Sequence, residues 1–354
     1  MSDLISNTVK NIKPLAKQAM ESARTRQDTL TKPAGSLGRL EELSIQLAGI
    51  QAKPLPQVKE KAIIVMAADH GVVAQGTSAY PQEVTPQMVM NFIHGGAGIN
   101  VISRQVGARV IFADIGVAGS LGRHPGLLSR KIAPGTRDMS QGSAMTTAQA
   151  TQALETGIEV INSEIKKGLD VVGTGDMGIG NTTASSAICA VMTGKTPAEV
   201  TGRGTGLDDR QLNHKIEVIE KSLALNKPDP TKPLEALAKV GGFEIGGLAG
   251  VILGAASQRI CVVIDGFISG AAALIAVGLA PQVKDYLIAA HVSAEPGHKL
   301  LLKHLGLKPL LDLNLRLGEG TGAGLGIALA ETACRILCEM ATFAEAGVAE
   351  KGEH

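Results

Sequence analysis

One carboxylate stands between glycines near the end of the 354-residue chain, in residues 315–324 (LRLGEGTGAG). Glycines let the backbone crowd a ligand, and they give Glu319 few side chains that would neutralise its charge. A carboxylate in such a setting tends to have a raised pKa and can act as a general base. The pattern is equally consistent with a structural role, because Glu319 also suits the positive end of a helix dipole.

A glycine-rich segment, residues 173–178 (GTGDMG), matches the G-x-G-x-x-G pattern of dinucleotide-binding loops. It follows a predicted strand and precedes a predicted helix at 181–192, as that pattern requires. The acidic residue expected about 20 positions later is Glu199, but it lies in a turn-like segment and not at the end of a second strand. The segment therefore indicates a phosphate held by backbone N–H groups, Asn181 and Thr182 at a helix N-terminus more than it indicates a dinucleotide.

A second glycine-rich stretch at residues 202–206 (GRGTG) can cradle a phosphate in the same way, and Lys215 follows it on a predicted helix. A lysine that points toward the stretch would supply a compact positive charge. A lysine on the solvated face of the helix would have no such role, and the spacing alone favours this second interpretation.

The remaining reactive residue types form no pattern that favours metal or nucleophilic chemistry. The eight histidines show no HxH or HExxH spacing, and no GxSxG nucleophile elbow occurs. We therefore predict no metal and no cofactor. The cysteines are expected to be small buried hydrophobes in a reducing compartment; they are Cys189, Cys261, Cys334 and Cys338.

The composition excludes several classes of protein. Basic and acidic residues number 34 and 33, so the chain has no bulk charge that favours nucleic acid or an anionic membrane. Five Phe, two Tyr and no Trp offer little for stacking on single-stranded bases. The first residues do not resemble a signal peptide, and the longest apolar stretch, near residues 266–279, is too short to span a membrane. We predict a globular protein of the cytoplasm.

Short apolar runs alternate with helical patterns along most of the chain, which predicts a parallel α/β sheet of Rossmann-like type with helices on both faces. Asp or His and Gly follow several of these strands. Because ligands bind at the carboxyl ends of such strands, the polar residues predict a shared cleft. The expected strands are residues 61–67, 109–115, 169–173, 260–265 and 286–292.

Both ends of the chain are predicted to be helical, over residues 3–30, 40–50 and 324–343. These helices are expected to pack together as a small helical subdomain. The predicted boundaries are 1–56 for its N-terminal part, 57–325 for the α/β domain and 326–354 for the returning C-terminal helix.

Eight ordered motifs give the chain a resemblance to the nicotinate-nucleotide–dimethylbenzimidazole phosphoribosyltransferase family of cobalamin lower-ligand synthesis. The motifs run nearly from end to end, which makes them far more specific than a single glycine-rich loop. They are residues 32–41 (KPAGSLGRLE), 68–72 (ADHGV), 80–85 (YPQEVT), 173–183 (GTGDMGIGNTT), 239–250 (KVGGFEIGGLAG), 265–269 (DGFIS), 293–297 (SAEPG) and 315–324 (LRLGEGTGAG).

The resemblance implies a reaction in which nicotinate mononucleotide gives its phosphoribosyl group to 5,6-dimethylbenzimidazole. The products are nicotinate and α-ribazole 5′-phosphate, so C1′ inverts from β to α. The family's general base maps onto Glu319, which would take the proton that benzimidazole loses as its other nitrogen attacks. Nicotinate leaves from a cationic pyridinium and needs no acid, and the enzyme chiefly positions two rings about one ribose.

The resemblance also implies binding residues and a homodimer. The phosphate and ribose would lie against one group of residues: Gly175, Asp176, Gly178, Asn181, Thr182, Gly202, Gly204, Lys215 and Ser293. The benzimidazole pocket would be lined by a second group: Tyr80, Met88, Met177, Leu317 and Gly318.

Two other functions remain open from the sequence. An NAD-linked oxidoreductase would use the glycines of residues 173–178, and it would need a ribose-binding carboxylate at the end of a second strand. A non-catalytic nucleotide-binding module would use the same glycines, but Glu319 would then have no function.

Overall fold

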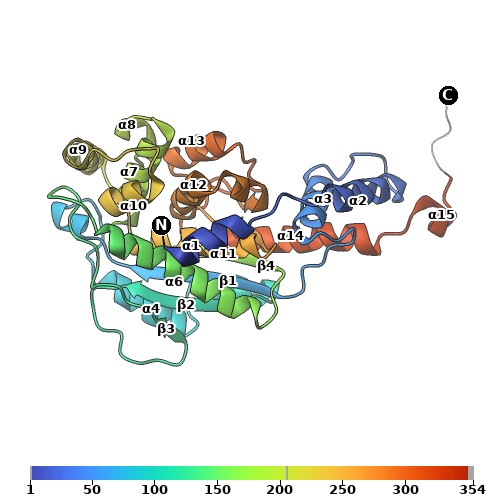
Figure 1. Ribbon diagram of the computed structural model, residues 1–354, viewed down its shortest axis with the longest axis horizontal. Coiled ribbons are helices and arrows are strands. Elements are labelled where there is room, and N and C mark those ends of the chain that lie inside the picture. Colours follow the sequence, from blue (N-terminus) through green and yellow to red (C-terminus); the bar gives the residue numbers. More distant parts are fainter. Residues whose placement is uncertain (1, 205, 350–354) are drawn as a thin grey trace.

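A six-stranded, fully parallel sheet forms the centre of the molecule in the computed structural model, which describes residues 2–204 and 206–349 (Figure 1). The order of the strands across the sheet is β3-β2-β1-β4-β5-β6. The predicted α/β class with a Rossmann-like parallel sheet is therefore confirmed. The strands are β1 (Lys61–Ala68), β2 (Arg109–Gly116), β3 (Leu127–Ser129), β4 (Val171–Met177), β5 (Cys261–Ile264) and β6 (Leu287–Ala289).

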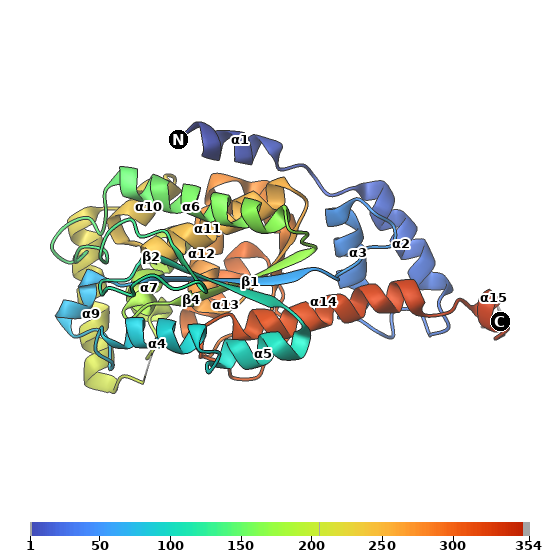
Figure 2. The same cartoon turned by 90° about the horizontal axis from the view of Figure 1, so that it is seen from below.

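The strands form where β-branched and small apolar residues run without interruption. In β1 (KAIIVMAA), every residue after Lys61 is buried, as expected of a strand that is covered on both faces. One face of the sheet is covered by α11 (Phe243–Ser257), with α6 (Thr147–Ile165) packed on it, and the other by α4 (Val84–Ile93), α5 (Gly98–Val106) and α14 (Thr321–Glu339) (Figure 2).

The order of the strands reverses between β1 and β4. The chain builds β1, β2 and β3 toward one edge and then returns to add β4, β5 and β6 toward the other. β1 and β4 pair in register up to Ala67 and Met177, so the two strands end side by side. Open α/β sheets bind ligands in the crevice that forms at this point, beyond the carboxyl ends of the strands.

Glycines allow the two helices on one face to touch backbone to backbone. A Cβ on Gly157 of α6 would overlap the carbonyl oxygen of Gly247 in α11. A Cβ on Gly250 would likewise overlap the carbonyl oxygen of Leu154. Part of the high glycine content thus serves the packing of helices and not the binding of ligands.

The helices at the two ends of the chain form a small second core. Ala23 of α2 (Lys17–Thr29), Ala48 of α3 (Arg39–Gln51) and Leu337 of α14 make a cluster separate from the main core. The predicted subdomain exists in this form, although α14 runs unbroken through the predicted boundary at residue 325. The exact domain boundaries remain predictions, and residues 350–354 of the C-terminal part lie outside the described residues.

The first helix differs from the prediction. Residues 3–30 are not one helix, because α1 (Asp3–Asn11) ends before Pro14 and α2 begins only at Lys17. Proline disfavours helical backbone in the residue before it, which accounts for the break. α1 then packs on α11 and α6, and its Ile5 belongs to the main core rather than to the small subdomain.

Two further expectations about strands need correction. β4 does not end at Gly173 but continues to Met177, so the GTGD segment lies within the strand. The glycines of this segment suggested a turn. Gly175 instead lies within the strand, where a side chain would collide with the backbone of Glu319. The short edge strand β3 was not predicted.

The remaining helices pack around this frame. They are η1 (Gly71–Gln75), α7 (Asn181–Thr193), α8 (Pro197–Val200), α9 (Asp209–Asn226), α10 (Pro233–Val240), α12 (Phe267–Leu279), η2 (Pro281–Tyr286), α13 (Pro296–Leu305) and α15 (Phe343–Ala346). By length and composition α14 is apolar enough to cross a membrane, but 56% of its apolar window is buried inside the protein, as in a core helix.

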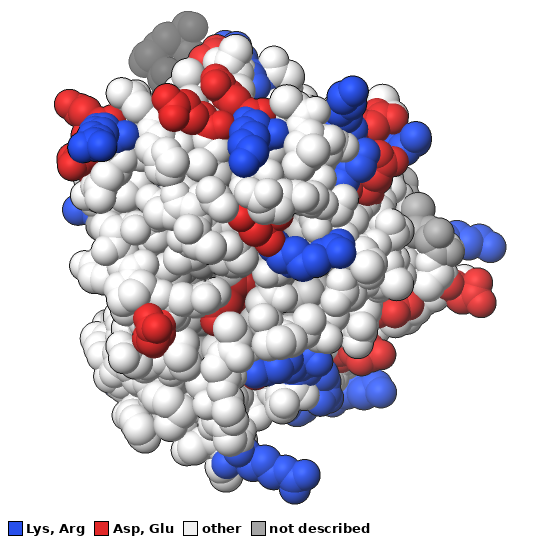
Figure 3. Space-filling model, turned by 90° about the vertical axis from the view of Figure 1, so that its left-hand side faces the viewer, with Lys and Arg blue, Asp and Glu red and all other residues white. Residues whose placement is uncertain are grey.

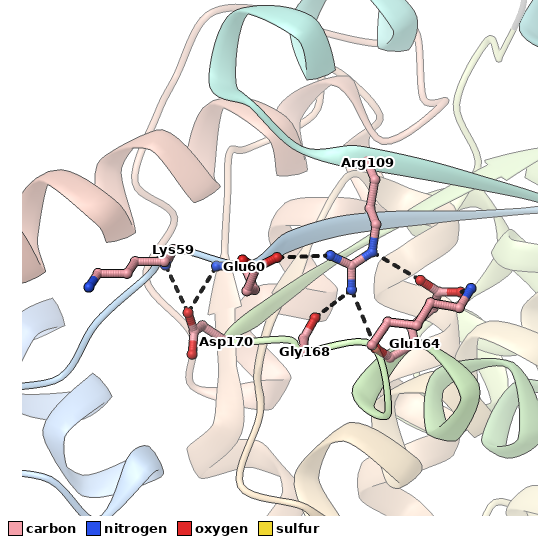
Figure 4. A network of polar contacts seen from close by, with 7 residues as sticks. Lys59, Glu60, Arg109, Glu164, Gly168 and Asp170 are labelled. Atoms are coloured by element: carbon pink, nitrogen blue, oxygen red, sulfur yellow. Dashed lines mark hydrogen bonds and ion pairs between the residues drawn. The ribbon is translucent and has the colours of Figure 1, made fainter.

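A network of polar contacts ties together the starts of the strands, at the end of the sheet opposite the crevice (Figure 4). Arg109 of β2 contacts the carboxylate of the buried Glu164 at 3.0 Å and that of Glu60 at 3.3 Å. Asp170, just before β4, accepts hydrogen bonds from the backbone N–H groups of Lys59 and Glu60. These contacts hold β1, β2 and β4 in register at their amino ends.

Because the helix backbones touch at Gly157, we expect Gly157→Ala to destabilise the protein strongly. The added methyl meets a backbone carbonyl that cannot rotate away, so the loss should be about 3 kcal/mol in the free energy of unfolding. Urea denaturation measures it. Gly142→Ala is the control, because a Cβ there meets nothing within 4 Å. Equal urea midpoints for the two variants would contradict the backbone contact.

Candidate active site

A cavity of about 280 Å³ opens at the carboxyl ends of the strands, where the sheet reverses direction. The end of the molecule that carries it is hollowed and mostly uncharged, with a few acidic and basic side chains in and beside the hollow (Figure 3). Its lining comes from the end of β4, from the segments and helix starts that follow β4, β5 and β6, and from Tyr80 before α4. The lining residues are Tyr80, Asp176, Met177, Gly178, Ile179, Asn181, Thr182, Gly204, Gly266, Phe267, Ile268, His291, Ser293, Glu295, Arg316, Leu317 and Gly318.

The glycine-flanked glutamate lies in a turn that the fully buried Asp265 holds. The Asp265 carboxylate accepts hydrogen bonds from the N–H groups of Gly320 (3.2 Å) and Ala323 (3.0 Å) at the start of α14. Gly318, Glu319 and Gly320 all have positive φ, at 79°, 62° and 93°. Only glycine adopts this conformation readily, so Glu319 is strained and depends on its surroundings to stay there.

Glu319 is 4% exposed, and its carboxylate faces the N-terminus of α5. Its Oε2 accepts a hydrogen bond from the Ile99 N–H at 3.1 Å, and Gly98 leaves room for this approach. Burial raises the pKa of Glu319, and the charge of Asp265 adds to the rise, while the N–H groups of Ile99 and Gly98 oppose it. The expected direction of the pKa shift is present, but Glu319 has more neighbours than the sequence indicated.

Asp176, at the end of β4, is a second buried acid on the cavity wall. Burial raises its pKa well above the ordinary value, and the charges of Asp265 and Glu244 push in the same direction. The side chain of Asn181 donates a hydrogen bond to Asp176 at 2.9 Å and opposes the shift only in part. Asp176 is therefore held in its neutral form to a higher pH than an ordinary aspartate.

Lys215 is fully buried in the structure, so its placement on a solvated helix face is wrong. Its Nζ donates hydrogen bonds to Thr182 Oγ1 at 2.9 Å and to the carbonyl oxygen of Gly202 at 3.3 Å. Burial lowers the pKa of Lys215 to about 8, and the nearby carboxylate of Glu295 counteracts the shift. The two glycine-rich segments thus meet around one buried cation, although Thr205 lies outside the described residues.

The histidines at the strand ends support this wall. His70 pairs with the buried Glu244 at 2.7 Å, and His291 lies 3.7 Å from Asp265. The Ser293 N–H donates to His298 at 2.8 Å. Burial lowers the pKa of His298 to about 3, so its ring is neutral and free to accept that bond.

Most of the predicted binding residues converge on the cavity. On its wall lie Asp176, Gly178, Asn181, Thr182, Gly204, Ser293, Tyr80, Met177, Leu317 and Gly318. Four others stand just behind it: Gly175 against Glu319, Gly202 against Glu295, Lys215 behind Thr182, and Glu319 itself. Met88 is not among the lining residues; it lies on α4, half-buried against the main core, and its part in the base pocket stays a prediction.

Sequence reasoning missed two residues of the wall that can do chemistry, Glu295 and Arg316, whereas His291 was expected there as a polar residue at a strand end. Glu295 lies two positions after Ser293 in the motif of residues 293–297, and Arg316 directly precedes Leu317. The sequence could have indicated both residues through these neighbours, which were predicted site residues. Across residues 2–204 and 206–349 the structure contains no group of three or more His, Cys, Asp or Glu placed to hold a metal ion.

The dinucleotide alternative finds no support at Glu199. That residue is exposed on α8, where its carboxylate bonds to Thr196 in a capping box and pairs with Lys195. It does not stand at the end of a second strand, which is where a ribose-binding carboxylate belongs.

Comparison with known proteins decides the family. A family model described as Phosphoribosyltransferase matches residues 12–348. The chain belongs to the phosphoribosyltransferase family. Two relatives are named nicotinate-nucleotide–dimethylbenzimidazole phosphoribosyltransferase. That of Desulforudis audaxviator is 60% identical and that of Chloroflexus aggregans 61%, over 98% and 99% of this chain and 99% of each relative.

A solved structure agrees with this assignment. The crystal structure of CobT from Thermus thermophilus is 48% identical and superposes with a TM-score of 0.91, over 94% of this chain and 100% of that one. The resemblance drawn from the motifs is therefore confirmed, and the chain is a pentosyltransferase by family.

The raised pKa of Asp176 predicts a gain in stability for Asp176→Asn at neutral pH. The unfolded chain releases this proton near the ordinary value of 3.8, whereas the folded protein holds it to higher pH. The folded state therefore loses stability as pH rises above about 4. Asparagine is neutral at every pH and avoids that loss, so the variant's Tm should exceed that of the wild type by about 3 °C at pH 7.5.

Thermal unfolding at several pH values checks this expectation. The advantage of Asp176→Asn should shrink as the pH is lowered toward 4, where Asp176 is protonated in both states. Asp28→Asn is the control, because Asp28 is exposed on α2 and its replacement should not change the pH profile. A constant difference between Asp176→Asn and wild type across this range would refute the buried-acid explanation.

Proposed function

We propose that this chain transfers the phosphoribosyl group of nicotinate mononucleotide to 5,6-dimethylbenzimidazole, giving α-ribazole 5′-phosphate and nicotinate. The names of its relatives support the reaction. The observation that carries the proposal is a buried glutamate of raised pKa beside a cavity whose other end is backed by a buried lysine. A base and a phosphate-binding cation at one cavity suit transfer of a phosphorylated sugar.

The phosphate and ribose are assigned to the end of the cavity where α7 begins. Gly178, Asn181, Thr182 and Gly204 line this end, and Lys215 stands behind Thr182. Backbone N–H groups at a helix N-terminus favour an anion, and the buried ammonium adds a full charge. The proposed ribose then lies between this end and Glu319.

The acceptor base is assigned to the opposite, less polar end. Tyr80, Met177, Leu317 and Gly318 line it, and the Tyr80 and Leu317 side chains are more than half exposed. A flat, apolar heterocycle would cover this surface and reach past Leu317 and Gly318 toward the carboxylate of Glu319.

The proposed chemistry needs one base and no acid. The bond between C1′ and the pyridinium nitrogen breaks, and its electron pair returns to nicotinate. One benzimidazole nitrogen bonds to C1′ from the opposite face, which inverts the centre, while the N–H proton of the other nitrogen passes to Glu319. The raised pKa makes the Glu319 carboxylate a stronger base than an ordinary glutamate. The proposed mechanism uses no metal and no cofactor.

Glu319→Gln tests the base directly. The amide keeps the size of the side chain but cannot take a proton, so nicotinate release should fall about 10³-fold while both substrates still bind. The acid limb of the wild-type pH profile should also disappear, because the carboxylate must be ionised to act. Release of nicotinate from nicotinate mononucleotide and dimethylbenzimidazole, assayed in EDTA, gives both results. A variant as fast as wild type would remove Glu319 from the mechanism.

Arg316 supplies a test of how the leaving group is recognised. Among the cavity-lining residues of the described chain it is the only lysine or arginine, and the pyridine ring of the donor carries a carboxylate. Arg316→Gln should raise KM for nicotinate mononucleotide about tenfold, because a charged hydrogen bond is lost. KM for nicotinamide mononucleotide, which lacks the carboxylate, should stay unchanged. Equal changes for both donors would contradict this assignment.

The homodimer and the location in the cytoplasm belong to the same proposal. The homodimer is implied by the family resemblance, and the location in the cytoplasm is the expectation drawn from the composition. Sequence and family together imply small-molecule substrates, and the balanced charge gives no support to nucleic acid or a membrane as a partner.

A further inference from the structure

We propose that Glu295 is a positioning residue of the phosphate-binding end, which holds the turn of residues 202–204 in place and keeps Lys215 in its charged form. This inference rests on the proposed function, since it takes the Lys215 end of the cavity as the phosphate site. Glu295 does not touch the reacting atoms and acts through these two groups.

Two opposite charges hold the same short turn, residues 202–204. Lys215 Nζ donates a hydrogen bond to the carbonyl oxygen of Gly202 at 3.3 Å. Glu295 Oε1 accepts one from the N–H of Gly204 at 2.9 Å. A Cβ on Gly202 would overlap the other carboxylate oxygen of Glu295, so that the carboxylate lies directly against the turn. Removal of either side chain frees one end of the turn.

The Glu295 side chain is oriented toward this turn and does not cap the helix that it precedes, α13. It occupies the N-cap position of α13, where a carboxylate commonly accepts a bond from the N–H groups of its own helix. The Glu295 side chain makes no such bond and turns to Gly204 instead. The Oε2 atom is buried without a hydrogen-bond partner among the described residues. A buried carboxylate oxygen without a hydrogen-bond partner is costly, which indicates that the negative charge of Glu295 has a function.

Lys215 needs a negative charge close by. Its side chain is fully buried, and both of its hydrogen-bond acceptors, the hydroxyl of Thr182 and the carbonyl of Gly202, are neutral. An ammonium group in such a place tends to lose its proton. Burial lowers the pKa of Lys215 to about 8, and the carboxylate of Glu295 is what prevents a larger fall.

Other charged groups near Lys215 are engaged elsewhere. On α8, Glu199 pairs with Lys195, and on α10, Glu235 pairs with Lys239. α7 carries no Lys, Arg, Asp or Glu. The remaining charged neighbours face solvent: His214 and Glu217 on α9 itself, and the Arg203–Asp209 pair at its start. Within the described residues, Glu295 is therefore the buried acid that acts on this lysine.

Glu295→Gln separates charge from shape. The amide oxygen can still accept from the Gly204 N–H, but the negative charge is gone. We expect the pKa of Lys215 to fall by about one unit, so that its charged fraction at pH 8 drops from about one half to about one tenth. The alkaline limb of kcat/KM for nicotinate mononucleotide should move about one pH unit lower. KM at pH 8 should rise about fivefold, with kcat changed less than about twofold.

Two further variants serve as controls. Glu295→Asp keeps the charge and loosens the contact with Gly204, so its alkaline limb should stay near that of wild type. Glu199→Gln removes an exposed charge from the adjacent α8 and should change neither KM nor the pH profile. An unshifted alkaline limb in Glu295→Gln would overturn the proposal, even if KM rose.

Stability gives a second test that does not depend on turnover. In urea denaturation, Lys215→Met and Glu295→Gln should each lower the midpoint, and the double variant should lose less than the two losses added together. If Glu295→Gln alone does not fold, folding of the double variant supports the pairing, and its failure contradicts it. Strictly additive losses would also contradict the pairing. Absence of nicotinate release by wild type would instead refute the proposed function.

Discussion

Two hydrogen bonds from the start of α14 to the carboxylate of Asp265 fix the position of Glu319 relative to the sheet and the cavity. They join the end of β5 to the turn of residues 318–320, whose positive φ angles would not persist without support. The turn sets the position of Glu319 beside the cavity. From the same point α14 runs along the sheet and ends among α2 and α3, so one buried aspartate links the site to the small helical core.

The site collects buried charged groups, each of which costs the fold stability unless an opposite charge lies close by. The charge of Asp265 raises the cost of ionising both Asp176 and Glu319, and Lys215 stands buried at the other end. Surface ion pairs would not behave in this way, because water screens them. A carboxylate that resists ionisation is a better base, and a buried ammonium is a stronger partner for phosphate, so the same burial that costs stability supplies the chemistry.

Glycine makes this arrangement possible in two different ways. At Gly175 and Gly98 the absence of a side chain lets the backbone and the carboxylate of Glu319 come close. At Gly157 and Gly250 it lets α6 and α11 touch along their backbones, far from the cavity. The sequence predicted glycines chiefly at strand ends for ligand binding. It gave no means to separate the two uses, because both depend on neighbours that are distant along the chain.

The sequence by itself determined the class of fold and most of its strands and helices, and it singled out Glu319 as a candidate base. These follow from local rules: uninterrupted apolar runs make buried strands, proline and glycine end helices, and a carboxylate among glycines stands out. Only the tertiary structure decided that Lys215 is buried, that β4 continues through Gly175, that Met88 lies off the cavity wall and that Glu295 faces Gly204. The physical reason is that burial, and with it each pKa, depends on contacts between residues that lie far apart along the chain. No local pattern of residues encodes those contacts.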